Sequence, residues 1–282
     1  MPGYAKMQKA LEQQVQLNGY SKSTLTNYGR SIAKISLYFG CTPLELEDQQ
    51  INEYLVELNH SQSPSKSYFK HTVYGLRYVF RLMNRDDRAI RLPSIKRAKT
   101  LPVVLSRQEC KRLFKAPKLL RHRVLLLFIY SAGLRVSELC RLRMEDIDSD
   151  RMMIHVRQSK GRKDRYVVLS KLALAGLRKY FRGERPVTWL FNGKKPGTPM
   201  SHHGVQWVMR EAVKKAGIRK KATVHTLRHS YATHLLEAGL DLVTVKEQMG
   251  HVRIESTMEY LHIARLRPQQ AFSPLDVLYG KK

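Results

Sequence analysis

The stretch ATVHTLRHSYATHLLEAG, residues 222–239, places apolar residues at helical spacing on one side and reactive side chains on another. This repeat predicts a helix over 225–238 with one buried face. The buried face is supplied by Leu227, Tyr231, Leu235 and Leu236. His225 and Arg228 are three residues apart, so they share a different face of the same helix. The stretch therefore predicts a helical protein that presents a histidine and an arginine together.

Three more blocks and a single tyrosine extend this set of polar side chains over the second half of the chain. They are AGLRVSEL (132–139) with Arg135, SKGRKDR (159–165) with Lys160, MGH (249–251) with His251, and Tyr260 nine residues later. Two arginines, two histidines, a lysine and a tyrosine together suit attack on a phosphodiester without a metal. Each residue taken alone has a structural explanation, but their order and contexts point to one site.

Each residue type answers a need of phosphoryl transfer. Arginine binds the non-bridging oxygens through two parallel hydrogen bonds and stays charged. Tyr260 could attack phosphorus if arginines and a base stabilise its phenolate, and either histidine could act as base or as acid. Lys160 could protonate the leaving sugar oxygen, with Lys163 and Lys171 as less favoured substitutes. HxxR is not a metal-ligand spacing, so we expect no metal site.

The composition points to a polyanionic partner. Lysine and arginine number 51, aspartate and glutamate 23, and the formal net charge is +28. Such an excess repels itself in a folded protein, and nucleic acid is the partner that compensates it best. A basic surface that is merely solvated is the alternative. Cys41, Cys110 and Cys140 have no metal or disulfide spacing, and no apolar run approaches the roughly 20 residues of a membrane span. We therefore expect a cytoplasmic, nucleoid-associated protein without a membrane partner.

The periodicity predicts two domains that are mainly α-helical, with one small antiparallel β-sheet. Helices over 4–18, 23–39, 43–59 and 65–83 form an N-terminal bundle, residues 1–87. A basic linker follows at 88–104, and a second domain at 105–282 begins with a capping box from Ser106 to Glu109. Segments 151–159 and 164–170 are strand-like and form a hairpin with a basic tip. Later helices are predicted at 171–182, 201–216, 225–238, 241–249 and 255–266.

With these blocks in view, the chain resembles the tyrosine recombinases of the phage integrase family over nearly its full length. The motifs that carry the resemblance are AGLRVSEL, HTLRHSYATH, GH and the late tyrosine, in that order. The resemblance implies a helical core-binding domain followed by an α+β catalytic domain. It also implies a site-specific recombinase or integrase that joins a 3′-phosphate to tyrosine and needs neither ATP nor a metal. Four subunits would assemble on two inverted DNA sites, with an accessory directionality factor as a further partner.

The resemblance assigns roles residue by residue. Arg135, His225, Arg228 and His251 would form the phosphate pocket, Lys160 would be the general acid, and Tyr260 would be the nucleophile. Glu138 would support them. The basic residues of the hairpin tip and the linker are expected to bind DNA: Arg162, Lys163, Arg165, Lys96 and Arg97.

Within the family, the chain is most similar to chromosome-dimer recombinases and integron integrases. It lacks room between Trp189 and His225 for the extra insertion of integron integrases, which argues against a folded single-stranded substrate. The amphipathic tail 271–282 resembles the segment that docks on a neighbouring subunit, although it could also fold on its own domain. A mobile-element integrase is our preferred biological role.

Three other interpretations stay open at this point. A type IB topoisomerase uses similar chemistry but rejoins the same strand. A catalytically silent DNA-binding protein and a basic RNA-binding bundle would make no use of Tyr260.

Overall fold

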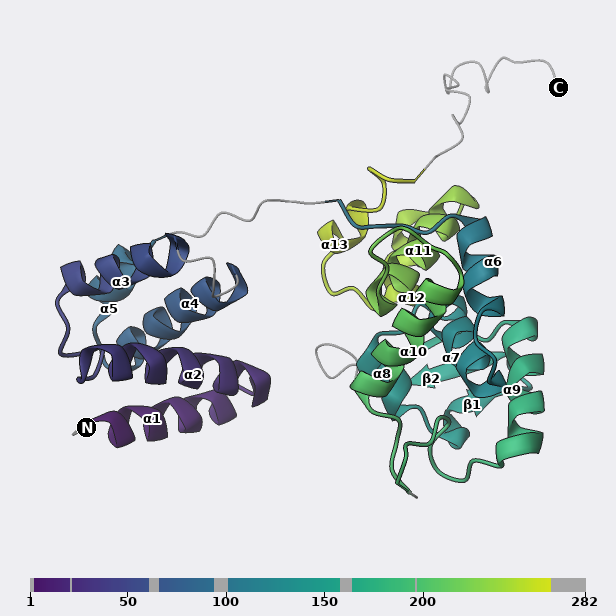
Figure 1. Cartoon of the computed structure of the whole chain (residues 1–282), viewed down its shortest axis with the longest axis horizontal. Helices are drawn as coiled ribbons and strands as arrows, with labels where there is room; N and C mark the ends of the chain where they lie inside the picture. The colour runs from purple at the N-terminus through teal and green to yellow at the C-terminus, as the bar shows by residue number, and fades with distance from the viewer. Residues whose placement is uncertain are drawn as a thin grey trace, which may run out of the picture. The chain divides into compact units, whose positions relative to one another are not determined.

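The computed structural model describes residues 3–20, 22–60, 66–93, 101–157, 164–195 and 197–264. The chain divides into two compact units, Met1–Ala98 and Lys99–Lys282, and each unit is described by itself. Helices dominate both units, and the second also contains a three-stranded antiparallel sheet (Figure 1). The predicted fold class, mainly α with a small antiparallel sheet, is therefore confirmed.

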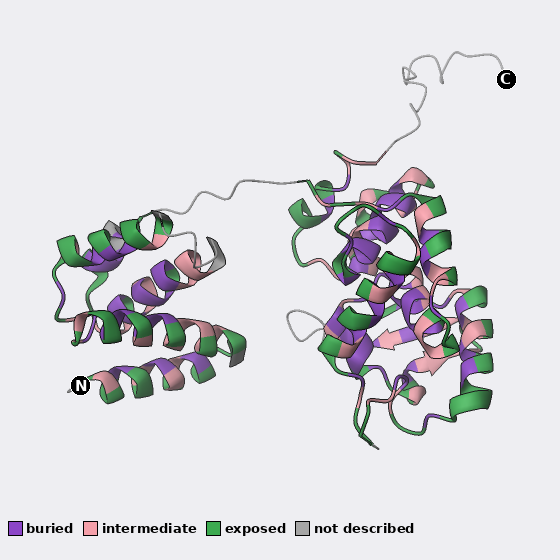
Figure 2. Ribbon diagram, in the orientation of Figure 1, coloured by how far each residue is buried: buried purple, intermediate pink, exposed green. Residues whose placement is uncertain are grey.

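Helices of the first unit enclose one apolar core. They are α1 (Tyr4–Leu17), α2 (Lys22–Phe39), α3 (Asp48–His60), α4 (Lys66–Leu82) and α5 (Asp86–Arg91). Apolar residues recur at helical spacing, as Met7, Leu11 and Val15 do on α1, and these three side chains are buried. Figure 2 shows buried and exposed positions alternating along the helices of this unit. Burial of such a stripe, more than helix propensity, holds helices of this length together.

Helix α5 lies in the segment that the sequence analysis assigned in part to the linker. The structure instead gives a short helix whose Ala89 is completely buried, and Leu92 just after it is also buried in the first core. Six residues span less than two turns, so no helical repeat could appear in the sequence. Helical packing in the first unit therefore continues to Leu92, five residues beyond the expected end of the bundle at 87.

The second unit is built around α7, whose residues from Val124 to Ile129 are all apolar. Its helices are α6 (Arg107–Lys115), α7 (Leu120–Ser131), α8 (Val136–Arg141), α9 (Lys171–Glu184), α10 (His202–Lys215), α11 (Val224–Glu237), α12 (Leu242–Met249) and α13 (Glu255–Met258), with a 3₁₀ turn η1 (Met144–Asp146). Helix α7 contacts α6, α9 and α11, and for this reason Val124, Leu125 and Phe128 are all buried. A helix surrounded on all sides needs no polar face.

The sheet comprises β1 (Ile147–Asp148), β2 (Met153–Val156) and β3 (Arg165–Val168), in that order. Strands β2 and β3 pair antiparallel with Val156 opposite Arg165, as the predicted hairpin requires. Strand β1 is only two residues long and was not predicted. Strand β3 contacts α12, and this contact brings the start of β3 to the end of that helix.

Two local predictions have clear outcomes. The capping box is confirmed, because Ser106 Oγ accepts from the Glu109 N–H and Glu109 accepts from the Ser106 N–H. The helix expected over 255–266 is shorter, since α13 ends at Met258 and turns follow to Ala264. Within the described residues, no helix is both long enough and apolar enough to span a membrane.

Candidate active site

Arg135 enters the site from a turn that only glycine can make. Gly133 has φ +57°, and a Cβ there would lie 2.5 Å from the Tyr231 ring. The chain therefore turns tightly between α7 and α8, and Arg135 becomes the N-cap residue of α8. Its side chain is 19% exposed, more than that of either other arginine in the site. Arg135 is thus the arginine with the best access from solvent.

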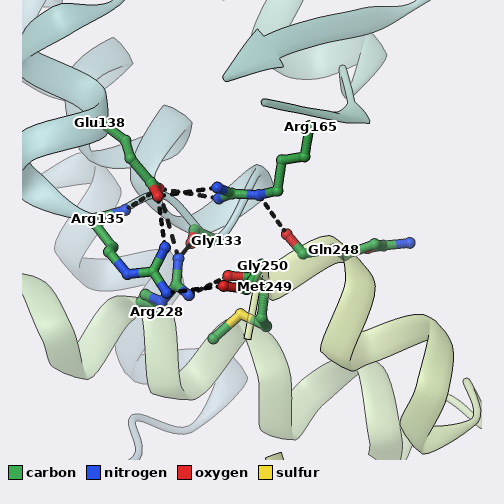
Figure 3. Close-up of polar contacts among 8 residues, drawn as sticks. All are labelled: Gly133, Arg135, Glu138, Arg165, Arg228, Gln248, Met249 and Gly250. Atoms are coloured by element: carbon green, nitrogen blue, oxygen red, sulfur yellow. Dashed lines mark hydrogen bonds and ion pairs between the residues drawn. The ribbon is translucent and has the colours of Figure 1, made fainter. Parts of the chain in front are cut away.

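Glu138 is the carboxylate that joins the arginines of the site (Figure 3). Its oxygens accept from Arg135 Nη1 at 2.6 Å and from Arg165 Nη1 and Nη2 at 2.9 and 3.0 Å. It also accepts from the Arg135 backbone N–H at 2.8 Å, which caps α8. Burial would raise the pKa of Glu138, but the bonds and charges of Arg165 and Arg135 outweigh it and lower the pKa to about 2. Glu138 is therefore ionised at neutral pH.

The C-terminal end of α12 accepts hydrogen bonds from three arginines. Arg165 Nε donates to Gln248 O at 3.2 Å, Arg135 Nη2 donates to Gly250 O at 3.1 Å, and Arg228 Nη2 donates to Met249 O (Figure 3). The last carbonyls of a helix have no partner inside it and carry partial negative charge. Three successive carbonyls thus hold three guanidinium groups in fixed positions.

Arg228 is the most deeply buried member of this group. It projects from α11, and Nη1 donates to Gly133 O while Nη2 donates to Met249 O. Its nearest carboxylate oxygen is Glu138 Oε2 at 3.7 Å, and its side chain is 4% exposed. Burial and the neighbouring Arg135 lower the pKa of Arg228 below its ordinary value. A bound anion would offset the repulsion between the two guanidinium groups.

His251 follows α12 through a left-handed turn at Gly250. Gly250 has φ +59°, and the His251 N–H donates to Lys246 O at 3.1 Å, which closes the helix end. The imidazole Nδ1 lies 2.9 Å from Thr257 Oγ1, and burial and Arg228 lower the pKa of His251 to about 3. Gly250 thus closes the helix in the left-handed conformation, and the turn brings a neutral histidine to the site.

Tyr260 lies in the turns after α13 and is almost completely buried, with 3% of its surface exposed. Its hydroxyl is 3.0 Å from Nδ1 of His229, and its ring stacks on His251 at a centroid distance of 6.2 Å. Burial raises the pKa of Tyr260 to about 12, although Arg228 and Arg135 pull in the opposite direction. The phenol is therefore neutral at pH 7 in the unliganded protein.

A cavity of about 530 Å³ opens beside Arg135, between α8, α10 and the start of α11. Arg135 and His225 line it together with His202, Gln206 and Arg210 of α10. His225 is open to solvent on one side, while the protein around the other side of the ring and the charge of Arg228 lower its pKa. The cavity gives a phosphodiester a way to reach Arg135 from solvent.

The charges around Glu138 do not balance. Three guanidinium groups, those of Arg135, Arg165 and Arg228, surround this carboxylate. Buried positive charge without an equal negative charge favours binding of an anion. Arginine also matches the geometry of a phosphate. The arrangement can hold a phosphodiester next to the hydroxyl of Tyr260.

The structure brings together six of the residues singled out from the sequence, from four separate segments of the chain. They are Arg135, Glu138, His225, Arg228, His251 and Tyr260. Lys160, Arg162, Lys163, Lys96 and Arg97 lie outside the described residues, as does the tail 271–282. Arg165 is described, and its guanidinium binds Glu138, with 10% of its side chain exposed.

Sequence reasoning did not single out His229, which contacts Tyr260. One signal was present: His229 lies four residues after His225 and so belongs to the same helical face. In the part of the chain that the structure describes, no group of three or more His, Cys, Asp or Glu side chains is placed to hold a metal ion.

Two family models match the chain. The phage integrase family matches residues 103–267, and the phage integrase N-terminal SAM-like domain matches residues 7–89. A putative integrase/recombinase, y4qK of Sinorhizobium fredii, is 34% identical over 274 residues, which cover 96% of this chain and 89% of that protein. Tyrosine recombinase XerA of Pyrococcus furiosus is 32% identical over 269 residues, covering 94% and 92% of the two chains.

Solved structures share the fold. The XerH site-specific recombinase bound to a palindromic difH substrate aligns with a TM-score of 0.72 at 18% identity, covering 94% of this chain and 82% of that one. A lambda integrase tetramer bound to a Holliday junction aligns with a TM-score of 0.74 at 19% identity, covering 91% and 76%. At these identities the likeness extends to the fold alone.

Proposed function

Since the chain belongs to the phage integrase family and is a tyrosine recombinase that carries out site-specific recombination of DNA, we propose that Tyr260 is its nucleophile. Arg135 and Arg228 bind the scissile phosphate, and His225 and His251 complete the phosphate pocket. Glu138 holds the Arg135 guanidinium in position through their hydrogen bond. The observation that carries this proposal is the cluster of three guanidinium groups around one carboxylate, two of which act electrostatically on the Tyr260 phenol.

Cleavage proceeds by in-line attack of Tyr260 Oη on phosphorus. The Oη–P bond forms, the bond from phosphorus to the 5′-oxygen breaks, and DNA remains attached through a 3′-phosphotyrosine. Arg135 and Arg228 stabilise the charge on the non-bridging oxygens in the transition state. The departing 5′-oxygen takes a proton from Lys160, which lies in the sequence between β2 and β3.

Strand transfer is the same reaction in reverse with a different partner. The 5′-hydroxyl of a second DNA strand attacks the phosphotyrosine, gives its proton to Lys160 and releases Tyr260. One phosphoester bond replaces another at each step, so the reaction conserves bond energy. For this reason we propose that ATP takes no part, and that Arg135 and Arg228 supply the positive charge for which other phosphoryl-transfer enzymes use a metal.

The assembly is part of the same proposal. We propose that four subunits act on two inverted sites in double-stranded DNA, that residues 271–282 dock on a neighbouring subunit, and that an accessory factor sets the direction. The XerH complex with a palindromic substrate and the lambda integrase tetramer on a Holliday junction, both similar in fold, support this assembly. A protein with this task would work on the nucleoid.

We assign the DNA contacts of the basic segments in the same way. Arg162, Lys163, Lys96 and Arg97 remain our candidates for DNA binding, because lysine and arginine at segments between structural elements suit phosphate contacts. Arg165 has a different part. Its bidentate pairing with Glu138 makes it a support for the arginine cluster.

A covalent adduct tests the proposed chemistry directly. Rounds of binding to a random duplex pool first yield a sequence that the protein holds tightly. That sequence is then made with a nick next to the cleavage site, so that the short fragment diffuses away after cleavage and the adduct accumulates. We expect an adduct on a denaturing gel in EDTA, and none with Tyr260→Phe.

Two outcomes would reshape the proposal. If the protein binds the nicked duplex tightly and forms no adduct, Tyr260 is not a nucleophile on this DNA. If an adduct forms but a two-site assay yields no exchanged strands, the cleavage chemistry stands and the proposed assembly fails.

A further inference from the structure

His229 is the histidine that contacts the nucleophilic oxygen. Its Nδ1 lies 3.0 Å from Tyr260 Oη, and the two rings are 5.6 Å apart at an angle of 51°. His225 lies one turn earlier on α11, with its ring 6.4 Å from that of His229. Neither the motifs of the sequence nor the roles proposed above give His229 a part in the reaction.

The nucleophile needs a group that takes its proton. Burial raises the pKa of Tyr260 to about 12, so at pH 7 roughly one phenol in 10⁵ is ionised. Solvent has little access to the hydroxyl, because Tyr260 is 3% exposed. Attack on phosphorus therefore requires a proton acceptor inside the protein and within hydrogen-bond distance of Oη.

We infer that His229 accepts the proton of Tyr260 through Nδ1 as Oη attacks phosphorus, an inference that rests on the function proposed above. The O–H bond of Tyr260 breaks and an N–H bond forms on His229, while Oη bonds to phosphorus and the 5′-oxygen leaves with the electron pair. In strand transfer, His229 returns the proton to Oη as the tyrosine is released. Protons balance in both steps, since Lys160 serves the 5′-oxygen.

The surroundings of His229 keep it able to accept. Burial, His225 and Arg228 lower its pKa to about 4, so at neutral pH the ring is neutral and Nδ1 can carry a free lone pair. Tyr260 and His251 face it from the segment after α12. A phosphodiester bound by Arg135 and Arg228 adds a negative charge. This charge offsets the two arginines and raises the basicity of His229 when DNA is present.

The other two histidines are placed for different tasks. His225 is exposed and lines the cavity beside Arg135, a position suited to a phosphate oxygen. His251 stacks its ring on the face of Tyr260, and its Nδ1 is engaged by Thr257. His225 thus lies at the cavity, His251 lies against the Tyr260 ring within the proposed phosphate pocket, and of these three histidines only His229 contacts the hydroxyl.

The deciding variant is His229→Asn. The amide oxygen of asparagine occupies about the position of Nδ1 and accepts a hydrogen bond, but it does not take up a proton near neutral pH. We expect the rate of adduct formation on the nicked duplex to fall about 10²-fold or more at pH 7. The remaining rate should rise with pH where that of the wild type is flat, because hydroxide then removes the proton.

A second arm replaces Tyr260 with 3,5-difluorotyrosine, whose phenol is more acidic. This replacement should recover much of the rate lost in His229→Asn and change the wild-type rate far less. His203→Asn is the matched control, since His203 is exposed on α10, and it should cleave at the wild-type rate. Duplex binding and thermal unfolding show that each variant is folded, and His229→Gln is measured in the same way if His229→Asn does not bind.

Each outcome decides the inference. If the wild type forms the Tyr260 adduct and His229→Asn cleaves at the same rate with the same pH profile, His229 takes no proton and the inference is wrong, while the proposed function stands. If the rate falls but neither rises with pH nor responds to difluorotyrosine, His229 only positions the hydroxyl. If the wild type forms no adduct, the proposed function itself fails.

Discussion

Arg88 in the first unit and Arg228 in the second are both buried arginines held by backbone carbonyls, but they differ in how far a carboxylate compensates their charge. Arg88 donates to Leu44 O at 3.3 Å and Leu46 O at 2.7 Å, and its Nε meets Asp48 Oδ1 at 2.7 Å. Its guanidinium also lies 4.7 Å from the Phe80 ring centroid. Carbonyls, carboxylate and ring together satisfy the cation.

Arg228 has the carbonyls without a carboxylate of its own. Glu138 lies 3.7 Å away and forms its shorter contacts with Arg135 and Arg165. A buried cation whose charge is compensated holds a fold together, whereas one whose charge is shared with other cations leaves a place for an anion. The difference distinguishes a structural arginine from a candidate catalytic one, although both are equally hidden.

The largest test of this contrast is Arg228→Met. Loss of one preorganised donor to the phosphate should slow adduct formation by about 10²- to 10³-fold, roughly 3 to 4 kcal/mol. Stability should change much less, because removal of the cation also relieves its repulsion with Arg135. The measurement is the adduct rate on the nicked duplex at saturating protein, with thermal unfolding of the same sample. A rate within tenfold of wild type would mean that Arg228 is structural, like Arg88.

Glu138→Gln should remove the compensating charge while keeping the cap on α8. Three arginines would then face one another without a carboxylate, and we expect a loss of about 3 kcal/mol in the stability of the second unit. Inorganic phosphate should restore part of the loss, because an anion can replace the missing charge. Urea unfolding with and without phosphate measures both effects.

Glu109→Gln is the matched control for that change. Glu109 occupies the same capping-box position on α6 and pairs with Lys220 at 2.7 Å. Glutamine can also serve in a capping box, so this variant should lose about 1 kcal/mol or less. It should not respond to phosphate. Equal losses in the two variants would contradict the idea that Glu138 balances the arginines.

On the structural side of the comparison, Arg88→Met should destabilise the first unit by about 2 kcal/mol, because two buried carbonyls and Asp48 lose their partner. The adduct rate of the folded protein should stay near the wild-type value. Arg81→Met is the control, since Arg81 lies 3.9 Å from Asp86 and is largely exposed, and it should cost less than about 1 kcal/mol. Calorimetry of the full chain reports the unfolding of the first unit.

The sequence alone predicted the helices and caps that depend on residues close together in the chain. Helical repeats located α1 to α4, and the spacing of Ser106 and Glu109 gave the capping box. These features rest on hydrogen bonds and periodicities that span only a few residues, and such patterns are visible without a fold.

What the sequence could not predict depends on distant partners. His229 meets Tyr260 across 31 residues, and Arg165 meets Glu138 across 27. Arg165 follows a run of basic residues in the sequence and was therefore expected to bind DNA. Its bond to Glu138 becomes visible only in the folded chain. Helix α5 and strand β1 were missed for another reason, since they are too short to show a period.

The smallest effect is expected from substitutions at two glycines that share a left-handed conformation. Gly40 in the first unit has φ +72° and open space around it, whereas a Cβ on Gly250 would lie 3.0 Å from three atoms of the Arg165 side chain. Alanine at either position should cost about 1 kcal/mol through its backbone alone. Gly250→Ala must in addition displace Arg165, which holds Glu138 and Gln248 O.

Gly250→Ala should therefore lose somewhat more stability than Gly40→Ala, and only Gly250→Ala should slow adduct formation. Thermal unfolding and the adduct rate of both variants measure these two quantities. Equal adduct rates would mean that the cluster tolerates a shift of Arg165. In that event Arg135 and Arg228 would keep their positions through the other carbonyls at the end of α12, without help from the hairpin strand.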